Sequence, residues 1–339
     1  MELETQIAVL AIVLIVAIGA ATVLPSLADS DTSTGNFTLN NSPPTIISFT
    51  LYEADCTNTT DTMDPQTEYA LKIDISDNNT LNDISEIKVI LKTNSTSTSV
   101  LDNATDKATY KWTPSGGGPT EGWSLVGPSG STWAVTASSE KPDDLSATTG
   151  TWWLHFKPGK VARKTIDDNS RWDIYVKVTD NGGLTTEDIE CVCNMSWYGE
   201  ISALNKSYSF GSINLSDTNK SISSPDDGNI DVKTISNGNY KIQGKSENWE
   251  DDNGNTAVLD SDGNLDSGEF ALRASSQSDV GSSNLVSTSY ANIPGYNNVN
   301  GPTAETGAIN PIYQWVSVAS SGLPPGTYEG NFSVLISNA

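Results

Sequence analysis

Hydrophobic residues are arranged in two different ways along this chain. Residues 6–24 form one continuous apolar stretch without a charged side chain, and Pro25 follows it. As an α-helix rising ~1.5 Å per residue, such a stretch is about as long as the hydrocarbon core of a bilayer is thick. Beyond residue 44, short segments alternate apolar and polar residues, which is the pattern of half-buried β-strands. The chain is therefore predicted to be mainly β behind one hydrophobic N-terminal helix.

The first group of alternating segments lies between residues 45 and 195. The clearest runs from Trp172 to Asp180, where every second residue from Trp172 to Val178 is apolar, and residues 180–183 (DNGG) suit a tight hairpin. Short strands at such spacing predict a β-sandwich. The other predicted strands of this group begin at Thr45, Tyr69, Ile84, Thr151 and Thr185.

A second group of predicted strands follows a change in composition near Ser196. Its segments begin at Tyr208, Asn229, Tyr240, Gly268, Tyr313 and Gly330. The sequence thus predicts four parts: a hydrophobic helix over residues 1–27, a polar linker over residues 28–44, and two β-sandwich domains over residues 45–195 and 196–339.

Charge and composition narrow the possible partners. The chain has 18 Lys and Arg against 42 Asp and Glu, a formal net charge of −24, so its surface should repel phosphate and nucleic acid is not an expected partner. Only 36% of the residues are hydrophobic, but nine Trp and eleven Tyr argue against a disordered chain. Aromatic side chains are expected to fill much of the core.

Sequence patterns typical of catalytic sites are nearly absent. His155 is the one histidine, and it occupies the outward-facing register of a predicted strand, where a structural role is the simpler interpretation. No GxSxG elbow accompanies it, and no glycine-rich phosphate loop occurs between a strand and a helix. Three cysteines are too few and too widely spaced for a tetrahedral zinc site. The sequence predicts no enzyme and no cofactor.

An acidic stretch over residues 250–266 allows two interpretations. Asp260, Asp262 and Asn264 begin like a calcium-binding loop, but Leu265 stands where that loop requires glycine and Ala271 where it requires glutamate. The favoured interpretation is a polar turn between strands. The alternative is a structural Ca²⁺ site at the first three residues.

Tryptophans cluster in the first predicted sandwich and raise the alternative of carbohydrate binding, because exposed aromatic rings can stack on sugars. Core filling is the favoured role. Trp152 and Trp153 must nevertheless point to opposite faces of their strand, so one of them lies outside the core, covered by a loop, a partner or a glycan. The five residues concerned are Trp112, Trp123, Trp133, Trp152 and Trp153.

Acceptor sequences for N-linked glycans are frequent, which together with the hydrophobic segment favours an extracellular, glycosylated surface protein. Asn194 and the linker sites Asn36 and Asn40 are expected to be accessible. The full set is Asn36, Asn40, Asn58, Asn78, Asn94, Asn103, Asn194, Asn205, Asn214, Asn219 and Asn331.

The N-terminal segment resembles that of type IV pilins and archaeal pilin- or archaellin-like subunits. The resemblance rests on the short leader with Glu4, the unbroken apolar helix and the proline near its end. It implies that the helix first lies in the membrane and then packs against copies of itself in a filament. The positions that it implies for assembly are Glu4, Ile7, Leu10, Val13, Leu14, Val16, Ile18, Gly19 and Leu24.

The body over residues 45–195 resembles the immunoglobulin-like domains of archaeal and bacterial surface proteins, through PPTIISFTLYE at its start and VTDNGGLTTEDIECVC at its end. Alternation places Ile189, Cys191, Cys193 and Met195 on one inward face. If the first and last strands run parallel, as in many such domains, Cys56 is predicted to form a disulfide with Cys193, with Cys191 as the alternative.

These features predict a structural subunit of an extracellular, pilus-like filament that assembles with itself through its N-terminal helix. The alternative is a monomeric, membrane-anchored surface adhesin or glycan-binding protein. The two share every feature after the linker, and they differ in whether the helix ends in a filament or in lipid.

Overall fold

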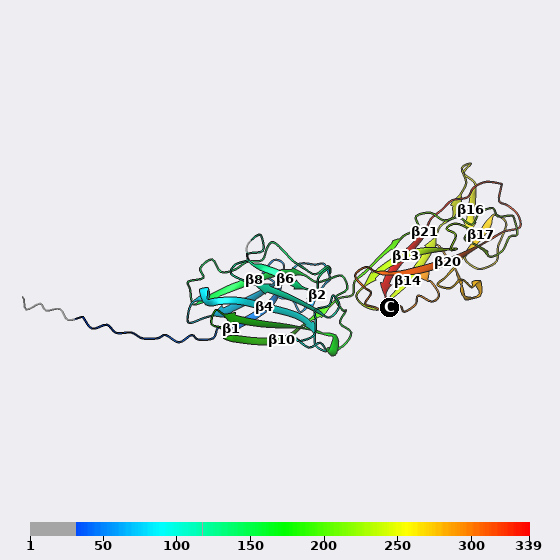
Figure 1. Ribbon diagram of the computed structural model, residues 1–339. Helices are drawn as coiled ribbons and strands as arrows, with labels where there is room; N and C mark the ends of the chain where they lie inside the picture. The colour runs from blue at the N-terminus through cyan, green and yellow to red at the C-terminus, as the bar shows by residue number, and fades with distance from the viewer. Residues whose placement is uncertain (1–31, 117) are drawn as a thin grey trace, which may run out of the picture. The chain divides into compact units, whose positions relative to one another are not determined.

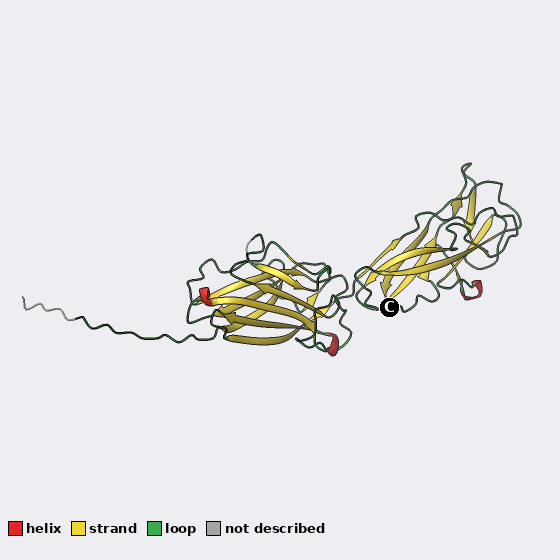
Figure 2. Ribbon diagram, in the orientation of Figure 1, coloured by secondary structure: helices red, strands yellow, loops and turns green. Residues whose placement is uncertain are grey.

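The computed structural model describes residues 32–339 except residue 117, and not the side chains of residues 191 and 192. The chain divides into two units, residues 1–40 and residues 41–339. The helix predicted for residues 1–27, with its proposed assembly positions from Glu4 to Leu24, lies outside the described residues. In the described part, no helix is long and apolar enough to cross a membrane. Its regular structure is β, apart from three short 3-10 turns: η1 (Leu81–Asp83), η2 (Asp168–Ser170) and η3 (Val280–Ser282) (Figure 2). The prediction of a mainly β fold is confirmed.

Two sheets formed by residues 45–195 face each other across one hydrophobic core (Figure 1). The first sheet has the order β1-β3-β8-β7 and the second has the order β2-β10-β9-β4-β5-β6. Their strands are β1 (Thr45–Glu53), β2 (Thr62–Met63), β3 (Tyr69–Ser76), β4 (Ile84–Thr93), β5 (Lys107–Trp112), β6 (Trp123–Gly127), β7 (Ala134–Val135), β8 (Thr149–Lys157), β9 (Trp172–Asp180) and β10 (Thr185–Met195).

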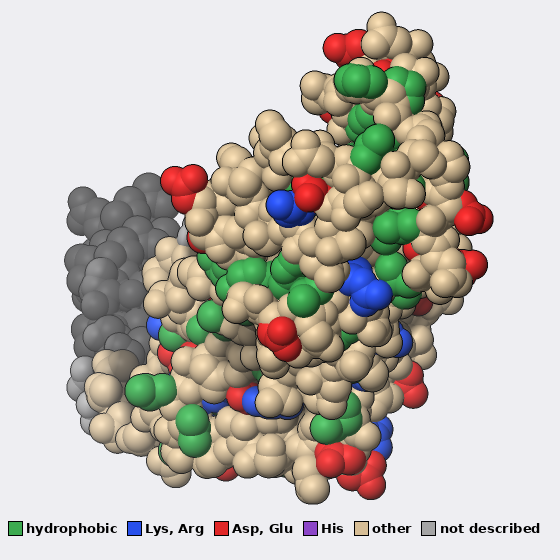
Figure 3. Space-filling view, turned by 90° about the vertical axis from the view of Figure 1, so that its right-hand side faces the viewer, with side chains coloured by type: hydrophobic (Ala, Val, Ile, Leu, Met, Phe, Trp, Pro, Cys, Tyr) green, Lys and Arg blue, Asp and Glu red, His purple; other side chains and the backbone are tan. Residues whose placement is uncertain are grey.

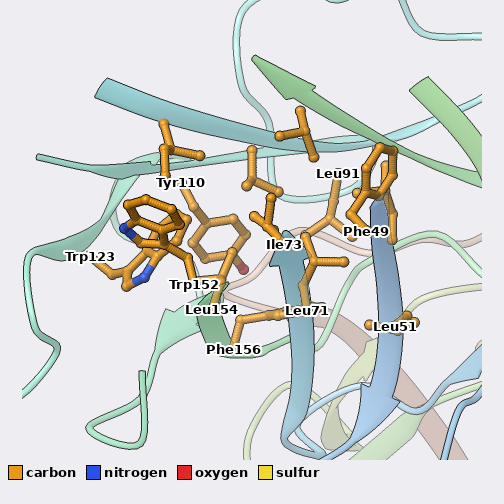
Figure 4. Close-up of a cluster of buried hydrophobic side chains, with 14 of the residues drawn as sticks. Phe49, Leu51, Leu71, Ile73, Leu91, Tyr110, Trp123, Trp152, Leu154 and Phe156 are labelled. Carbon is orange, nitrogen blue, oxygen red and sulfur yellow. The ribbon is translucent and has the colours of Figure 1, made fainter. Parts of the chain in front are cut away.

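The core of this first sandwich follows from alternation along its strands. In β8, Trp152, Leu154 and Phe156 are fully buried, whereas the residues between them face the other side of the sheet. Large aromatic side chains fill the space between the sheets, as the low aliphatic content led us to expect (Figure 4). Trp152 is thus the core member of the Trp152–Trp153 pair.

Residues 199–338 form a second set of sheets around a core of their own. One sheet has the order β11-β13-β20-β17-β16-β15, with β12 paired to β20 and β18 to β17, and the other has the order β19-β14-β21. The strands are β11 (Gly199–Ala203), β12 (Lys220–Ser221), β13 (Asn229–Ser236), β14 (Tyr240–Ser246), β15 (Trp249–Glu250), β16 (Thr256–Leu259), β17 (Glu269–Ser275), β18 (Asn284–Leu285), β19 (Ala291–Asn292), β20 (Ala308–Val318) and β21 (Phe332–Asn338).

A fully buried amide, Asn237, connects the two sets of sheets. Its Nδ2 donates to the carbonyl oxygens of Ala162 at 2.8 Å and Ser196 at 2.7 Å, and its Oδ1 accepts from the backbone N–H of Tyr198 at 2.7 Å. The carbonyl of Asn237 also accepts from the N–H of Lys164. Every polar atom of this side chain is satisfied, which removes the usual penalty for burying it.

The predicted alternation of β10 is broken near its end. The register against β9 shifts between Cys191 and Cys193, which is the signature of a β-bulge. As a result Cys193 and Met195 are buried, but Ile189, predicted to share their inward face, is 51% exposed. The prediction of one inward face from residue 189 to 195 is therefore wrong.

A buried carboxylate at the end of β3 is expected to cost stability at neutral pH. Asp77 is 1% exposed, Oδ1 accepts from the N–H of Asn79, and Oδ2 has no hydrogen-bond partner among the described residues. Burial, followed by the nearby carboxylates of Asp83 and Asp180, raises the pKa of Asp77 above its ordinary value. The folded state therefore binds this proton more tightly than the unfolded chain does, and stability falls as pH rises through the raised pKa.

Asp77→Asn should accordingly raise the melting temperature at pH 7 by about 2 °C. The gain should shrink as pH is lowered, because the wild-type carboxyl becomes neutral too. Thermal melts of both proteins from pH 7 to pH 3 test this, and a gain that does not depend on pH would contradict the assigned cause.

Candidate functional site

The face of the β1-β3-β8 sheet that points away from the core, which we call the outer face, carries a connected set of interacting side chains. Asp74 lies at its centre: its carboxylate accepts from Thr151 at 2.6 Å, Lys72 at 2.9 Å and Ser48 at 3.1 Å. Burial alone would raise the pKa of Asp74, but these hydrogen bonds and the charge of Lys72 outweigh it and lower the pKa. Asp74 thus remains ionised and holds its neighbours in place.

An aromatic pair lies beside this polar cluster. The ring of Trp153 on β8 is 5.5 Å from that of Tyr52 on β1, and the two planes meet at 63°. The strand between them, β3, places the small Ala70 opposite both Tyr52 and His155, so that side chains from the flanking strands can meet above it. Trp153 and Tyr52 are both partly exposed.

His155 occupies the outer face next to Trp153, as its register predicted, but it is covered. Its side chain is 6% exposed, its Nδ1 lies 3.3 Å from Oε1 of Glu68, and its Nε2 lies 3.4 Å from the sulfur of Cys56. Glu68 is itself fixed, because the same Oε1 accepts from Thr136 at 2.8 Å. The structure therefore assembles a line of thiol, imidazole and carboxylate that the sequence analysis did not foresee.

Cys56 reaches His155 from the turn that follows β1. Its φ of 56° lies in the left-handed region, and its N–H donates to the carbonyl of Glu53. Burial raises the pKa of the Cys56 thiol, and the carboxylates of Glu140, Asp55 and Glu68 raise it further. Activated cysteine nucleophiles sit in electropositive surroundings that lower this pKa. The line of three groups therefore lacks the electrostatics of a cysteine hydrolase.

The sequence predicted a disulfide between Cys56 and Cys193, and the structure does not contain it. Cys56 is a free thiol on the outer face of the first sheet. Cys193 is buried in β10 of the second sheet, with its sulfur 3.7 Å from the carbonyl of Trp172. The turn over residues 53–59 directs Cys56 toward β8 and away from β10. For the alternative partner, Cys191, the side chain lies outside the described residues.

The glycan acceptor residues differ in accessibility. Asn194, expected to be among the best placed, is half-buried because the short strand β2 pairs alongside it, and Asn103 and Asn205 are half-buried as well. Three exposed acceptors already use their amides: Asn58 donates to Asp55, Asn94 to the carbonyl of Asp168, and Asn331 to Glu247. The exposed members of the set are Asn36, Asn40, Asn58, Asn78, Asn94, Asn214, Asn219 and Asn331.

The acidic stretch over residues 250–266 uses its carboxylates for backbone turns. Oδ1 of Asp260 accepts from the N–H groups of Asp262 and Gly263, and Oδ1 of Asp251 accepts from those of Asn253 and Asn255. This matches the favoured interpretation of polar turns. In the part of the chain that the structure describes, no three His, Cys, Asp or Glu side chains, including those near Asp260 and Asp262, are gathered to hold a metal ion.

Two clefts of similar size hollow the described surface. A cleft of about 510 Å³ lies beside β1, and one of about 600 Å³ lies beside β14 and β21. On the face drawn in Figure 3, charged side chains are scattered and hydrophobic side chains form small groups between them. The first cleft is lined by Phe49, Thr50, Leu51, Thr59, Thr60, Asp61, Ile174 and Glu190. The second is lined by Lys245, Ser246, Glu247, Asn248, Glu250, Thr288, Glu329, Asn331 and Ser333.

Comparison with known proteins gives little further guidance. No family model and no curated protein matches the chain. A solved structure described as "Chaperone-tip adhesin complex is vital for synergistic activation of CFA/I fimbriae biogenesis" is similar over 88% of this chain and 92% of that chain, with 10% identity and a TM-score of 0.22. A likeness at this TM-score assigns no function.

The predicted relationship to pilins and archaellin-like subunits is wrong. No pilin family model matches, and the described residues contain strands and short 3-10 turns but no α-helix. The resemblance to immunoglobulin-like surface domains also finds no matching family model, so the supported statement is the coarser one, a mainly β protein with several sheets.

Proposed function

We propose that this chain is a membrane-anchored cell-surface protein of the adhesin type, and that it binds glycans with the outer face of the β1-β3-β8 sheet. The observation that carries the proposal is the position of Trp153. It is a large aromatic side chain on the outer face, partly exposed, and held edge-on against Tyr52. Buried Trp152, its neighbour in sequence, already supplies the core, so Trp153 is not needed there.

The surroundings of Trp153 suit a sugar. A pyranose presents an apolar face that packs on an aromatic ring and hydroxyl groups around its edge that need hydrogen-bond partners. Lys72 lies directly opposite Trp153 in the register, and Thr151 is two residues before it on the same face. Together with Asp74 and Ser48, these residues provide both donors and acceptors next to the ring. The cluster is ordered without a ligand, which lowers the entropy lost on binding.

The remaining parts of the proposal rest on the sequence. The apolar stretch over residues 6–24 serves as the anchor, the sandwiches lie outside the cell, and exposed acceptor residues such as Asn78 and Asn214 carry glycans. No enzymatic activity is proposed, because the thiol beside His155 has electrostatics that oppose a nucleophile.

Replacing Trp153 with alanine should weaken glycan binding by tenfold or more, a loss of about 1.4 kcal/mol or greater. The full chain in detergent would be screened on a glycan array, and affinities for the best ligands would then be measured by calorimetry. Tyr290→Ala removes an exposed aromatic ring from the second set of sheets and serves as the matched control. Equal affinities for wild type and Trp153→Ala, with the fold intact, would show that the outer face does not bind the glycan.

A further inference from the structure

We propose that Cys56 and His155 form a binding site for a zinc ion, with Glu140 as the third protein ligand and water as the fourth. This site does not depend on the proposed glycan binding. It is based on the geometry of half-buried Cys56 and buried His155, on the carboxylate near the imidazole, and on the strand position of Glu140.

The sulfur and the nitrogen have the separation that a shared zinc ion requires. Zinc binds thiolate at ~2.3 Å and imidazole at ~2.0–2.1 Å, so two such ligands at a tetrahedral angle lie about 3.5 Å apart. The observed distance from Sγ of Cys56 to Nε2 of His155 is 3.4 Å. Little movement would be needed for both atoms to coordinate one ion.

The second ring nitrogen of His155 lies near a carboxylate. Histidines that bind zinc commonly donate their second ring N–H to a carboxylate, which fixes the ring and makes the ligand nitrogen more basic. Oε1 of Glu68 lies 3.3 Å from Nδ1 of His155 and accepts from Thr136, but Nδ1 makes no hydrogen bond among the described residues. We therefore expect the bond between Nδ1 and Glu68 to form when the ion binds. Ser139 fixes the backbone from the other side, because its Oγ accepts from the N–H of His155 at 2.9 Å. In this position of the ring, Nε2 of His155 faces the sulfur of Cys56.

Glu140 is the side chain that we propose as the third protein ligand. It forms an isolated antiparallel bridge with Trp153, so its side chain belongs to the outer face that also carries His155. It is exposed, and its charge already acts on the Cys56 thiol. The described side chains are not gathered as a set of three, so the carboxylate of Glu140 must turn toward the pair when the ion binds.

The chemistry of these donors selects the ion. A thiolate and an imidazole are softer ligands than the oxygen atoms that Ca²⁺ and Mg²⁺ prefer, and they suit zinc. Binding forms the bond between sulfur and zinc and releases the thiol proton to solvent. The carboxylates of Asp55, Glu68 and Glu140 surround the site with negative charge, which opposes a bare thiolate but favours a divalent cation.

The test is a Co²⁺ titration of the reduced, full-length protein, because cobalt reports both its ligands and its geometry in the absorption spectrum. Wild type should bind one ion, with a sulfur-to-cobalt charge-transfer band and the visible bands of tetrahedral Co²⁺, and Zn²⁺ should displace it. Cys56→Ser should abolish the charge-transfer band. Glu68→Gln should weaken binding by roughly 10- to 100-fold and keep the band. Asp262→Asn, in the acidic stretch of the second set of sheets, is the control and should change nothing.

A second measurement needs no variant. Alkylation of Cys56 by iodoacetamide, followed by peptide mapping, should slow when Zn²⁺ is added and recover when EDTA removes it. A charge-transfer band that survives Cys56→Ser would place the ion on another cysteine and overturn the proposal. Alkylation of Cys56 at the same rate with and without Zn²⁺ would overturn it as well.

Discussion

Trp172→Ala is expected to lower the free energy of unfolding by about 3–5 kcal/mol, one of the largest effects of any single substitution in this chain. Trp172 is fully buried at the start of β9, and its ring lies 5.5 Å from that of Trp133. Its Nε1 donates to the carbonyl of Arg163 at 2.9 Å. The substitution therefore leaves a large cavity and a backbone carbonyl without its partner. Chemical denaturation of both proteins measures the loss.

A pair of milder substitutions separates the cavity from the hydrogen bond. Trp172→Phe keeps most of the volume but loses the bond to Arg163, whereas Trp152→Phe removes an Nε1 that has no partner among the described residues. Both tryptophans are fully buried. The first change should cost ~1 kcal/mol more than the second. Equal costs would mean that the bond to Arg163 contributes nothing to stability.

Breaking the buried ion pair between Lys92 and Asp173 should be similarly costly. Nζ of Lys92 is 2.8 Å from Oδ2 of Asp173, the two residues lie directly opposite each other on β4 and β9, and their side chains are 7% and 5% exposed. Lys92→Met leaves the carboxylate buried without its counter-charge, and Asp173→Leu does the same to the ammonium. Each single change is expected to cost about 3–5 kcal/mol.

The double variant supplies the control. Replacing both members with apolar side chains removes the uncompensated charge, so Lys92→Met with Asp173→Leu should be close to wild type in stability. Oδ1 of Asp173 has no hydrogen-bond partner among the described residues. The bond to Lys92 therefore does not offset the full cost of burying the Asp173 carboxylate. A double variant as unstable as the sum of the two singles would show that packing, and not charge, governs this position.

Local patterns were enough to predict much of the fold. The alternation over residues 172–180 identified β9 with its bounds, because every second residue from Trp172 to Val178 is apolar and lies in the core. The same reasoning placed Trp152 and Trp153 on opposite faces. It failed in β10, where a bulge between Cys191 and Cys193 interrupts the period. A bulge adds one residue to a strand without any distinct composition, so the sequence gives no sign of it.

The candidate sites were harder to predict than the strands. Cys56 and His155 are 99 residues apart, and they meet because β3 pairs with β8 while the turn after β1 folds back over that pair. No local sequence pattern predicts a contact between side chains so far apart in the chain. Cys56 was assigned to a disulfide with Cys193 because the first and last strands of the domain were taken to run parallel. For Trp152 and Trp153, by contrast, the register alone predicted that one lies in the core and the other outside it, without saying which.

The most direct test of glycan recognition by the outer face is an NMR titration of the full chain with the best glycan from the array. The indole Nε1–H resonance of Trp153 should move, together with the amide resonances of Lys72 and Thr151, which share its face. The resonance of buried Trp172 should stay in place, because its Nε1–H is bonded to Arg163. Binding that moves resonances in the second set of sheets, such as those around Tyr290, and leaves Trp153 unchanged would contradict the account.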